Sequence, residues 1–176
     1  GIAIDLGTTT IAIEQIDMSD GSVTDRCGFM NPQIEYGSDV ISRIRTGSTE
    51  DGLAKLRSSV VTRISSELAG MGYAPADISR IIISGNTTMN AILERLLLDN
   101  LGHAPFEIRN PDSITVSGKD FFDDERFCSA EVTCLPNLSA FVGADALCGA
   151  VVCNIDRSDK YQLFADLGTN GELILA

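Results

Sequence analysis

The chain has 176 residues, 44% of them hydrophobic, which is enough for one domain, or one lobe of a larger one, with a real core. Its 25 acidic residues outnumber 13 Lys and Arg, for a formal net charge of −12, and this balance argues against non-specific binding to nucleic acid or to anionic membranes. No apolar run approaches the roughly 20 residues of a membrane span, so we expect no nucleic-acid partner and no membrane partner.

The first third of the chain predicts a three-stranded meander. Its strand-like segments are short and rich in apolar residues or Thr, at 1–5, 8–16 and 22–29, and a polar turn separates the last two. Ser38 is then expected to cap a helix, and apolar residues at helical spacing predict a longer helix at 53–71.

Strands and helices alternate in the rest of the chain. An apolar run predicts a buried strand at 81–83, and Thr87 or Thr88 is expected to start a helix that runs to Leu97. The segment 99–127 is expected to be irregular. The remaining predicted elements are a strand at 130–135, a small-residue helix at 139–152, and strands at 161–165 and 172–176. This order predicts an α/β fold with right-handed crossovers, in which helices cover the faces of a mixed sheet.

The sequence Asp-Leu-Gly-Thr occurs twice, at 5–8 and at 166–169. Each copy follows an apolar run and precedes residues that can continue a strand, so each predicts a strand–turn–strand unit. The glycine allows a tight turn, backbone N–H groups around such a turn can bind an anion, and threonine adds a hydroxyl. Together the two turns can hold a phosphate chain from both sides. The candidate phosphate-binding residues are Gly7, Thr8, Thr9, Gly168, Thr169, Asn170 and Gly171.

Three aspartates are the candidate catalytic residues. Asp5 and Asp166 stand at strand ends, where carboxylates suit Mg²⁺, usually through its retained waters. In an enzyme that acts on a phosphate chain they would position the metal and the attacking water, and one would accept a proton. Asp145 lies among small residues in an otherwise apolar helix. Because a buried charge is costly, Asp145 either faces the cleft or is satisfied at the helix surface.

Simpler interpretations stay open at this point. Gly, Asn and Asp are common turn residues, so both Asp-Leu-Gly-Thr copies can be ordinary hairpin turns. The segment 85–87, Gly-Asn-Thr, is either a turn with a helix cap or a contact with the cleft. Arg43 and Arg45 could contact a partner, but we expect them on a solvated helix face.

The cysteines suggest no metal centre within the chain. There are five, none in a Cys-x-x-Cys pair, and His103 is the single histidine. Such scattered thiols argue against a zinc or iron–sulfur site and are typical of a cytoplasmic protein. Because strand-like residues stand at both ends, we expect the chain to be part of a larger protein.

The order of elements, with a phosphate turn in the first hairpin, resembles one lobe of the actin, sugar kinase and Hsp70 (ASKHA) superfamily, which has a ribonuclease H-like fold. A closer resemblance is to the middle region of ATP-dependent reductive activators of corrinoid proteins (RACo-like), and it covers nearly the whole chain. The segments that carry it are 1–10, 31–33, 37–44, 83–89, 135–137, 141–146 and 166–171. The Ser-Gly-Asn-Thr-Thr-Met and Gly-Ala-Asp-Ala segments are the most specific.

This resemblance implies that the full-length protein uses ATP and Mg²⁺ to restore corrinoid proteins from Co(II) to Co(I). The electrons would come from a ferredoxin-type 2Fe-2S domain. This chain has neither the cluster cysteines nor the glycine-rich adenosine motif of the superfamily. Residues 1–176 are therefore expected to be a single N-terminal-type lobe of an actin-like ATPase domain, inactive alone, with the second lobe and the iron–sulfur domain elsewhere.

Two other functions remain open from the sequence. One is a small-molecule kinase of the same superfamily, although no segment points to a sugar or acid site. The other is a non-catalytic module that binds a partner under nucleotide control. A homodimer of the full-length protein is also left open.

Overall fold

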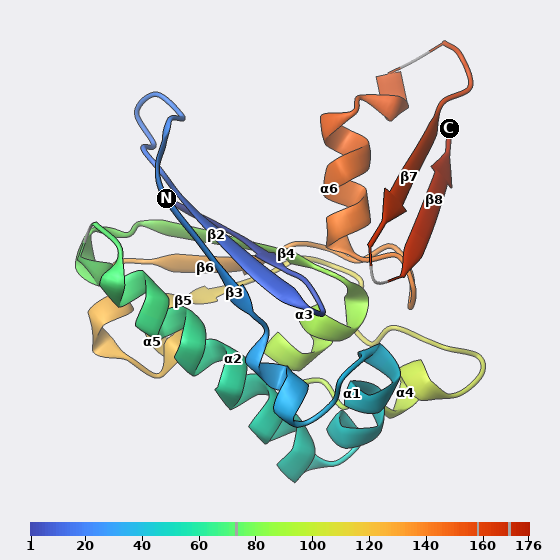
Figure 1. Ribbon diagram of the computed structural model, residues 1–176, viewed down its shortest axis with the longest axis horizontal. Coiled ribbons are helices and arrows are strands. Elements are labelled where there is room, and N and C mark those ends of the chain that lie inside the picture. The colour runs from blue at the N-terminus through green and yellow to red at the C-terminus, as the bar shows by residue number, and fades with distance from the viewer. Residues whose placement is uncertain (73, 158, 169) are drawn as a thin grey trace.

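The computed structural model describes residues 1–72, 74–157, 159–168 and 170–176, and for Asp156 the backbone only. It contains a six-stranded sheet in the order β3-β2-β1-β4-β6-β5 and a separate hairpin, β7-β8 (Figure 1). The strands of the large sheet are β1 (Ile2–Leu6), β2 (Thr10–Ile16), β3 (Val23–Met30), β4 (Arg80–Gly85), β5 (Ile114–Ser117) and β6 (Glu131–Cys134). The hairpin pairs β7 (Leu163–Leu167) with β8 (Gly171–Leu175).

Six α-helices are described, and four short 3₁₀ turns accompany them. The helices are α1 (Val40–Gly47), α2 (Glu50–Gly70), α3 (Thr87–Leu93), α4 (Asp99–Gly102), α5 (Gly118–Phe122) and α6 (Ala144–Val152). The 3₁₀ turns are η1 (Pro32–Glu35), η2 (Pro75–Asp77), η3 (Glu125–Phe127) and η4 (Ile155–Arg157). In this described part of the chain, no helix is long and apolar enough to cross a membrane.

The strand pairing confirms the predicted mixed sheet. β1, β2 and β3 form the antiparallel meander, while β4 runs parallel to both β1 and β6. β5 was not predicted, because it has only four residues and lies inside the segment 99–127, which was expected to be irregular. It pairs antiparallel with β6 at the sheet edge.

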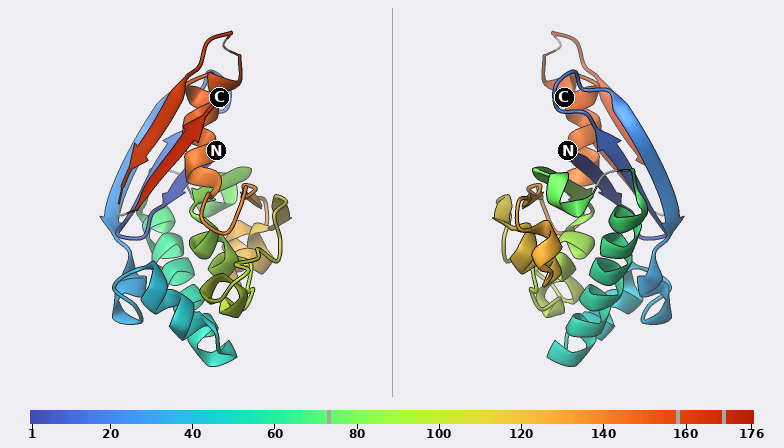
Figure 2. Two further views of the ribbon diagram at one scale, coloured as in Figure 1. Left: turned by 90° about the vertical axis from the view of Figure 1, so that its right-hand side faces the viewer. Right: turned by 90° about the vertical axis from the view of Figure 1, so that its left-hand side faces the viewer.

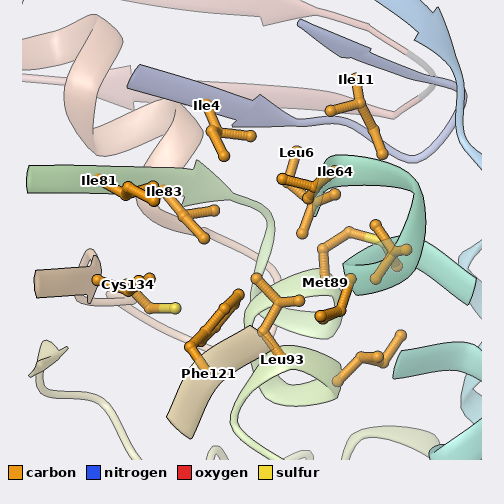
Figure 3. Close-up of a cluster of buried hydrophobic side chains, with 14 of the residues drawn as sticks. Ile4, Leu6, Ile11, Ile64, Ile81, Ile83, Met89, Leu93, Phe121 and Cys134 are labelled. Atoms are coloured by element: carbon orange, nitrogen blue, oxygen red, sulfur yellow. The ribbon is translucent and has the colours of Figure 1, made fainter. Parts of the chain in front are cut away.

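One face of the large sheet carries the hydrophobic core. Because side chains alternate along a strand, Ile4 and Leu6 of β1 point to the same face as Ile81 and Ile83 of β4. They pack there against α2, α3 and α5, as Figure 3 shows for the labelled side chains. Each such buried side chain contributes about 1.5–3 kcal/mol. The opposite face of β1 carries Ala3 and Asp5, and α6 packs on that side against β4.

Four helices differ from their predicted bounds: α2 spans Glu50–Gly70 instead of 53–71, and α3 ends at Leu93 instead of Leu97. The other two begin later than predicted, for local reasons. α1 begins after Asp39 instead of Ser38, because the Asp39 carboxylate accepts from the Ser42 backbone N–H in a capping box. α6 begins at Ala144, five residues later than predicted. The chain before it forms a turn in which Ser139 Oγ accepts from the N–H of Val142, and Ser139 N–H donates to the Val142 carbonyl.

The β7-β8 hairpin stands apart from the large sheet, next to α6 (Figures 1 and 2). Phe164 packs on α6 at Gly149, where an added Cβ would overlap its ring. One face of the hairpin is exposed and apolar. Its leucines are 63–84% exposed and are Leu163, Leu167, Leu173 and Leu175.

Candidate functional site

The first loop, residues 7–9, is a tight turn between β1 and β2. A Cβ on Gly7 would lie 2.6 Å from the Thr10 carbonyl oxygen, so this turn requires glycine. Asn31, at the end of β3, holds the loop from outside the cleft: its Nδ2 donates to the Gly7 carbonyl and its backbone N–H donates to the Thr9 carbonyl, both at 2.9 Å. Asp5 precedes this loop on β1, between β2 and β4.

Asn86 joins the first loop to α3. Its Oδ1 accepts from the Met89 backbone N–H and caps the helix, while its Nδ2 donates to Thr8 Oγ1 at 2.9 Å. The segment is therefore a turn with a helix cap, and its asparagine also contacts the first loop and lines the cleft described below.

Helix α6 places Asp145 beside the first loop. Its N-cap, Gly143, sits directly on the turn before α3, and a Cβ there would lie 2.7 Å from the carbonyl oxygen of Gly85. Asp145 follows two residues later in the first turn of α6, and its Oδ1 accepts from the Ala146 N–H at 2.9 Å. The close approach of the backbones thus places this aspartate beside the first loop.

The β7-β8 hairpin supplies the other side. Asp166 and Glu172 are direct partners across the two strands, so their side chains share a face. This is the face opposite to the exposed leucines. Gly168 and Asn170 lie in the connecting second loop, residues 168–171, whose Thr169 is outside the described residues.

These elements enclose one cleft of about 290 Å³. Its described lining contains Asp5, Gly7, Thr8, Thr9, Thr10, Asn86, Asp145, Asp166, Gly168, Asn170 and Glu172. Eight of these residues are candidates predicted from the sequence. Gly171 lines a neighbouring groove instead. Glu172 was not recognised as a site residue, although its place opposite Asp166 in a short hairpin was a usable signal.

Four carboxylates face one another in this cleft. The pKa of Asp5 is raised, first by the protein atoms that partly bury it and then by the negative charges of Asp145 and Asp166. Burial also raises the pKa of Asp145, and the charge of Asp166 adds to it. Glu172 has a raised pKa for the same two reasons, with Asp145 and Asp166 as the neighbouring charges.

This electrostatic arrangement fits a metal–phosphate complex better than a bare anion. No Lys or Arg is among the described residues that line the cleft, so every charged side chain that an isolated phosphate would meet there is negative. Over the described residues, no three His, Cys, Asp or Glu side chains are close enough to hold a metal directly. Mg²⁺ commonly keeps several waters and binds through one or two carboxylates plus phosphates. Asp5 and Asp166 fit that mode of binding.

The volume of the cleft limits what it can hold. Pockets for whole small ligands usually measure about 300–1,000 Å³, and this one lies at the lower limit. It is suited to the phosphate part of a nucleotide, and the nucleoside would need further surface.

Known proteins match this chain over nearly its whole length. The family model described as "RACo middle region" matches residues 1–158. The corrinoid activation enzyme RamQ of Eubacterium limosum is 33% identical over 178 residues, which cover 98% of this chain and 30% of that protein. The chain therefore spans about a third of the length of this relative.

Two solved structures share the fold. A reductive activator for corrinoid, iron-sulfur protein superposes with a TM-score of 0.90 at 31% identity, over 99% of this chain and 28% of that one. A protein described as a 2-dehydro-3-deoxygalactonokinase, from Sinorhizobium meliloti, superposes with a TM-score of 0.56 at 15% identity, over 99% of this chain and 49% of that one. The second match shows the fold alone.

The predicted fold class, an α/β lobe of the actin and sugar kinase type, is confirmed by these neighbours. The predicted resemblance to the reductive activators is confirmed as well. On the match to residues 1–158, the chain belongs to the RACo middle region family.

Proposed function

We propose that the full-length protein is an ATP-dependent reductive activator that returns a corrinoid protein from Co(II) to Co(I). The observation that carries the proposal is that Asp5 and Asp166 line the same cleft. They are separated by 160 residues in the sequence, and they lie on two different sheets. The names of the relatives supply the corrinoid partner. The purpose of ATP hydrolysis would be to drive electron transfer to cobalt at very low potential.

In this proposal the cleft binds the phosphates of ATP. Backbone N–H groups of the first and second loops hold the phosphate chain from opposite sides, and the hydroxyl of Thr8, fixed by Asn86, contacts it. Asp5 and Asp166 hold the waters around a bound Mg²⁺, which would neutralise charge on the phosphates. Asp145 and Asp5, whose pKa values are raised, orient the attacking water, and one of the two accepts its proton.

The rest of the site would come from parts of the protein beyond this chain. The exposed leucine face of β7-β8 is suited to pack into the core of a second ATPase lobe, and that lobe would complete the nucleoside site. The 2Fe-2S cluster would lie in a further domain, because such clusters are held by cysteine thiolates and residues 1–176 contain no Cys-x-x-Cys pair. Residues 1–176 alone would therefore neither turn over ATP nor transfer electrons. All five cysteines are free thiols, which supports a cytoplasmic location.

The experiment measures ATP hydrolysis and Co(I) formation by the full-length protein, with and without its corrinoid partner. We expect partner-stimulated hydrolysis together with cobalt reduction, and loss of both in Asp166→Asn. Asp77→Asn is the matched control, because Asp77 is exposed and lies outside the cleft. Phosphoryl transfer to a metabolite would instead support a kinase, and ATP binding without turnover would support a non-catalytic module.

A further inference from the structure

Arg43 is a buried cation without a hydrogen-bonded acidic partner in the described structure. We expected Arg43 on a solvated face of α1, and this was wrong: the residue is 1% exposed, whereas Arg45 is exposed. Burial lowers the pKa of Arg43 to about 10, an effect that the charge of Asp39 partly offsets, so it remains protonated at neutral pH. A buried charge is costly, which raises the question of what it holds in place.

The guanidinium of Arg43 joins two segments that precede α1 in the chain. Its Nε donates to the Gly37 carbonyl at 3.0 Å, and one terminal nitrogen donates to Gln33 Oε1 at 3.2 Å. That same nitrogen lies 3.3 Å from the sulfur of Met89 on α3. Arg43 therefore fixes η1, which contains Gln33, against two helices.

Gln33 and Asn31 extend this contact to the first loop. Gln33 is fully buried, and its Oε1 also accepts from Asn31 Nδ2 at 3.2 Å, while its Nε2 donates to the Leu56 carbonyl of α2. The Nδ2 of Asn31 donates in turn to the Gly7 carbonyl. A continuous chain of buried and partly buried hydrogen bonds thus runs from α1 through η1 to the loop between β1 and β2.

The two loop carbonyls that Asn31 binds decide where the loop N–H groups point. In a planar trans peptide the N–H is directed opposite to the C=O. Holding the carbonyls of Gly7 and Thr9 toward Asn31 therefore turns the N–H groups of Thr8 and Thr10 away from it. Asn31 is not among the described residues that line the cleft, so its effect on a ligand would act through this orientation.

We propose that Arg43, Gln33 and Asn31 are positioning residues that hold the first loop in the orientation needed for phosphate binding. The role in catalysis rests on the proposed function, but the effect on the loop does not. Misplacement of a binding group by about 1 Å can cost of the order of 100-fold in rate, so loss of this support has a measurable consequence.

Two variants of the full-length protein test the proposal. Asn31→Ser keeps a residue that can cap η1 but removes the Nδ2 donor to Gly7. Arg43→Lys keeps the charge but removes the fork that reaches both Gly37 and Gln33. The matched control is Asn90→Ser, because Asn90 is also fully buried but donates to Leu135 and Asn137, away from the first loop.

Hydrogen exchange of the peptide that covers residues 6–11 is the readout independent of activity. We expect exchange to be about 10-fold faster in both variants than in the wild type and in Asn90→Ser, and kcat/KM for ATP to fall about 10-fold or more in the same two variants. Unchanged loop protection in Asn31→Ser would overturn the proposal, as would equal effects in all three variants. Faster exchange with unchanged kcat/KM would overturn the catalytic part. If the wild type neither binds nor hydrolyses ATP, the proposed function fails, and the exchange comparison alone decides whether these residues hold the loop.

Discussion

The two loop glycines should respond oppositely to substitution by alanine, because one is required by the fold and the other is not. A Cβ on Gly7 would lie 2.6 Å from the Thr10 carbonyl oxygen, against the 3.4 Å at which ordinary contact begins. The backbone on both sides must therefore shift, and overpacking of this kind costs about 1–3 kcal/mol. A cost of about 2 kcal/mol lowers the melting temperature of a domain this size by roughly 4–8 °C.

A Cβ on Gly168 would meet nothing closer than 3.7 Å, and the φ of this residue lies outside the left-handed region. Gly168→Ala should therefore leave folding intact or stabilise it by about 0.4–1 kcal/mol, through a less flexible unfolded chain. The added methyl group would stand beside the cleft, where the proposed function needs close approach of the phosphates. We expect the Kd for ATP to rise about 10-fold, which is about 1.4 kcal/mol.

The assay combines thermal unfolding with equilibrium binding of ATP in the full-length protein, for the wild type and both variants. A loss of stability in Gly168→Ala equal to that in Gly7→Ala would refute the geometric reasoning. A wild-type Kd in Gly168→Ala would refute the assignment of the second loop to the phosphates.

Three further predictions concern folding and reactivity. Asn86→Ala removes a helix cap together with a bond to the first loop, and should cost about 1–2 kcal/mol in urea unfolding; an unchanged midpoint would contradict the cap. Asp145 has a raised pKa, so its ionised carboxylate destabilises the folded state. This destabilisation is complete above the pKa of the folded state and disappears as the pH falls below the pKa of the unfolded state. Asp145→Asn should therefore raise the free energy of unfolding at pH 7 but not near pH 3, and a gain of equal size at both would exclude a charge effect. Burial raises the pKa of Cys134 to about 12, so mass spectrometry after thiol labelling should find exposed Cys128 modified first and Cys134 only after unfolding; early labelling of Cys134 would show that this part of the core opens.

Much of the site could be predicted because its parts are local in sequence. Each Asp-Leu-Gly-Thr copy combines a strand, a glycine turn and a carboxylate within a few residues, and the chemistry of such a turn can be read directly. The fold then had only to bring the two copies together. The structure does so through the central strand β1 and the separate hairpin β7-β8.

The support of the first loop could not be predicted in the same way. The supporting residues are all polar: Asn31, Gln33 and Arg43. Polar residues of these types are normally predicted to lie in loops or on the exposed face of a helix. They are buried because η1 lies between α1, α2 and the β1-β2 turn. This tertiary contact cannot be predicted from the spacing of residues in the sequence. Strand β5 was missed for a different reason: three of its four residues favour a strand, but it is short and lies between segments rich in prolines, glycine and acidic residues.

Other elements were predicted with shifted bounds because side chains outside the periodic pattern decide where they begin. Asp39 takes the capping position next to Ser38. The turn at Ser139 delays the start of α6 by five residues, although the apolar pattern runs through it.

The two glycines of α6 have a consequence for protein engineering. Gly143 lets the helix touch the turn before α3, and Gly149 lets the ring of Phe164 rest on its backbone. The close contacts at these two glycines therefore set how near the β7-β8 hairpin lies to the large sheet. Neither glycine lines the cleft, so a designer could widen the opening between Asp5 and Asp166 by adding a single methyl group at Gly149, without altering any residue that would touch the nucleotide.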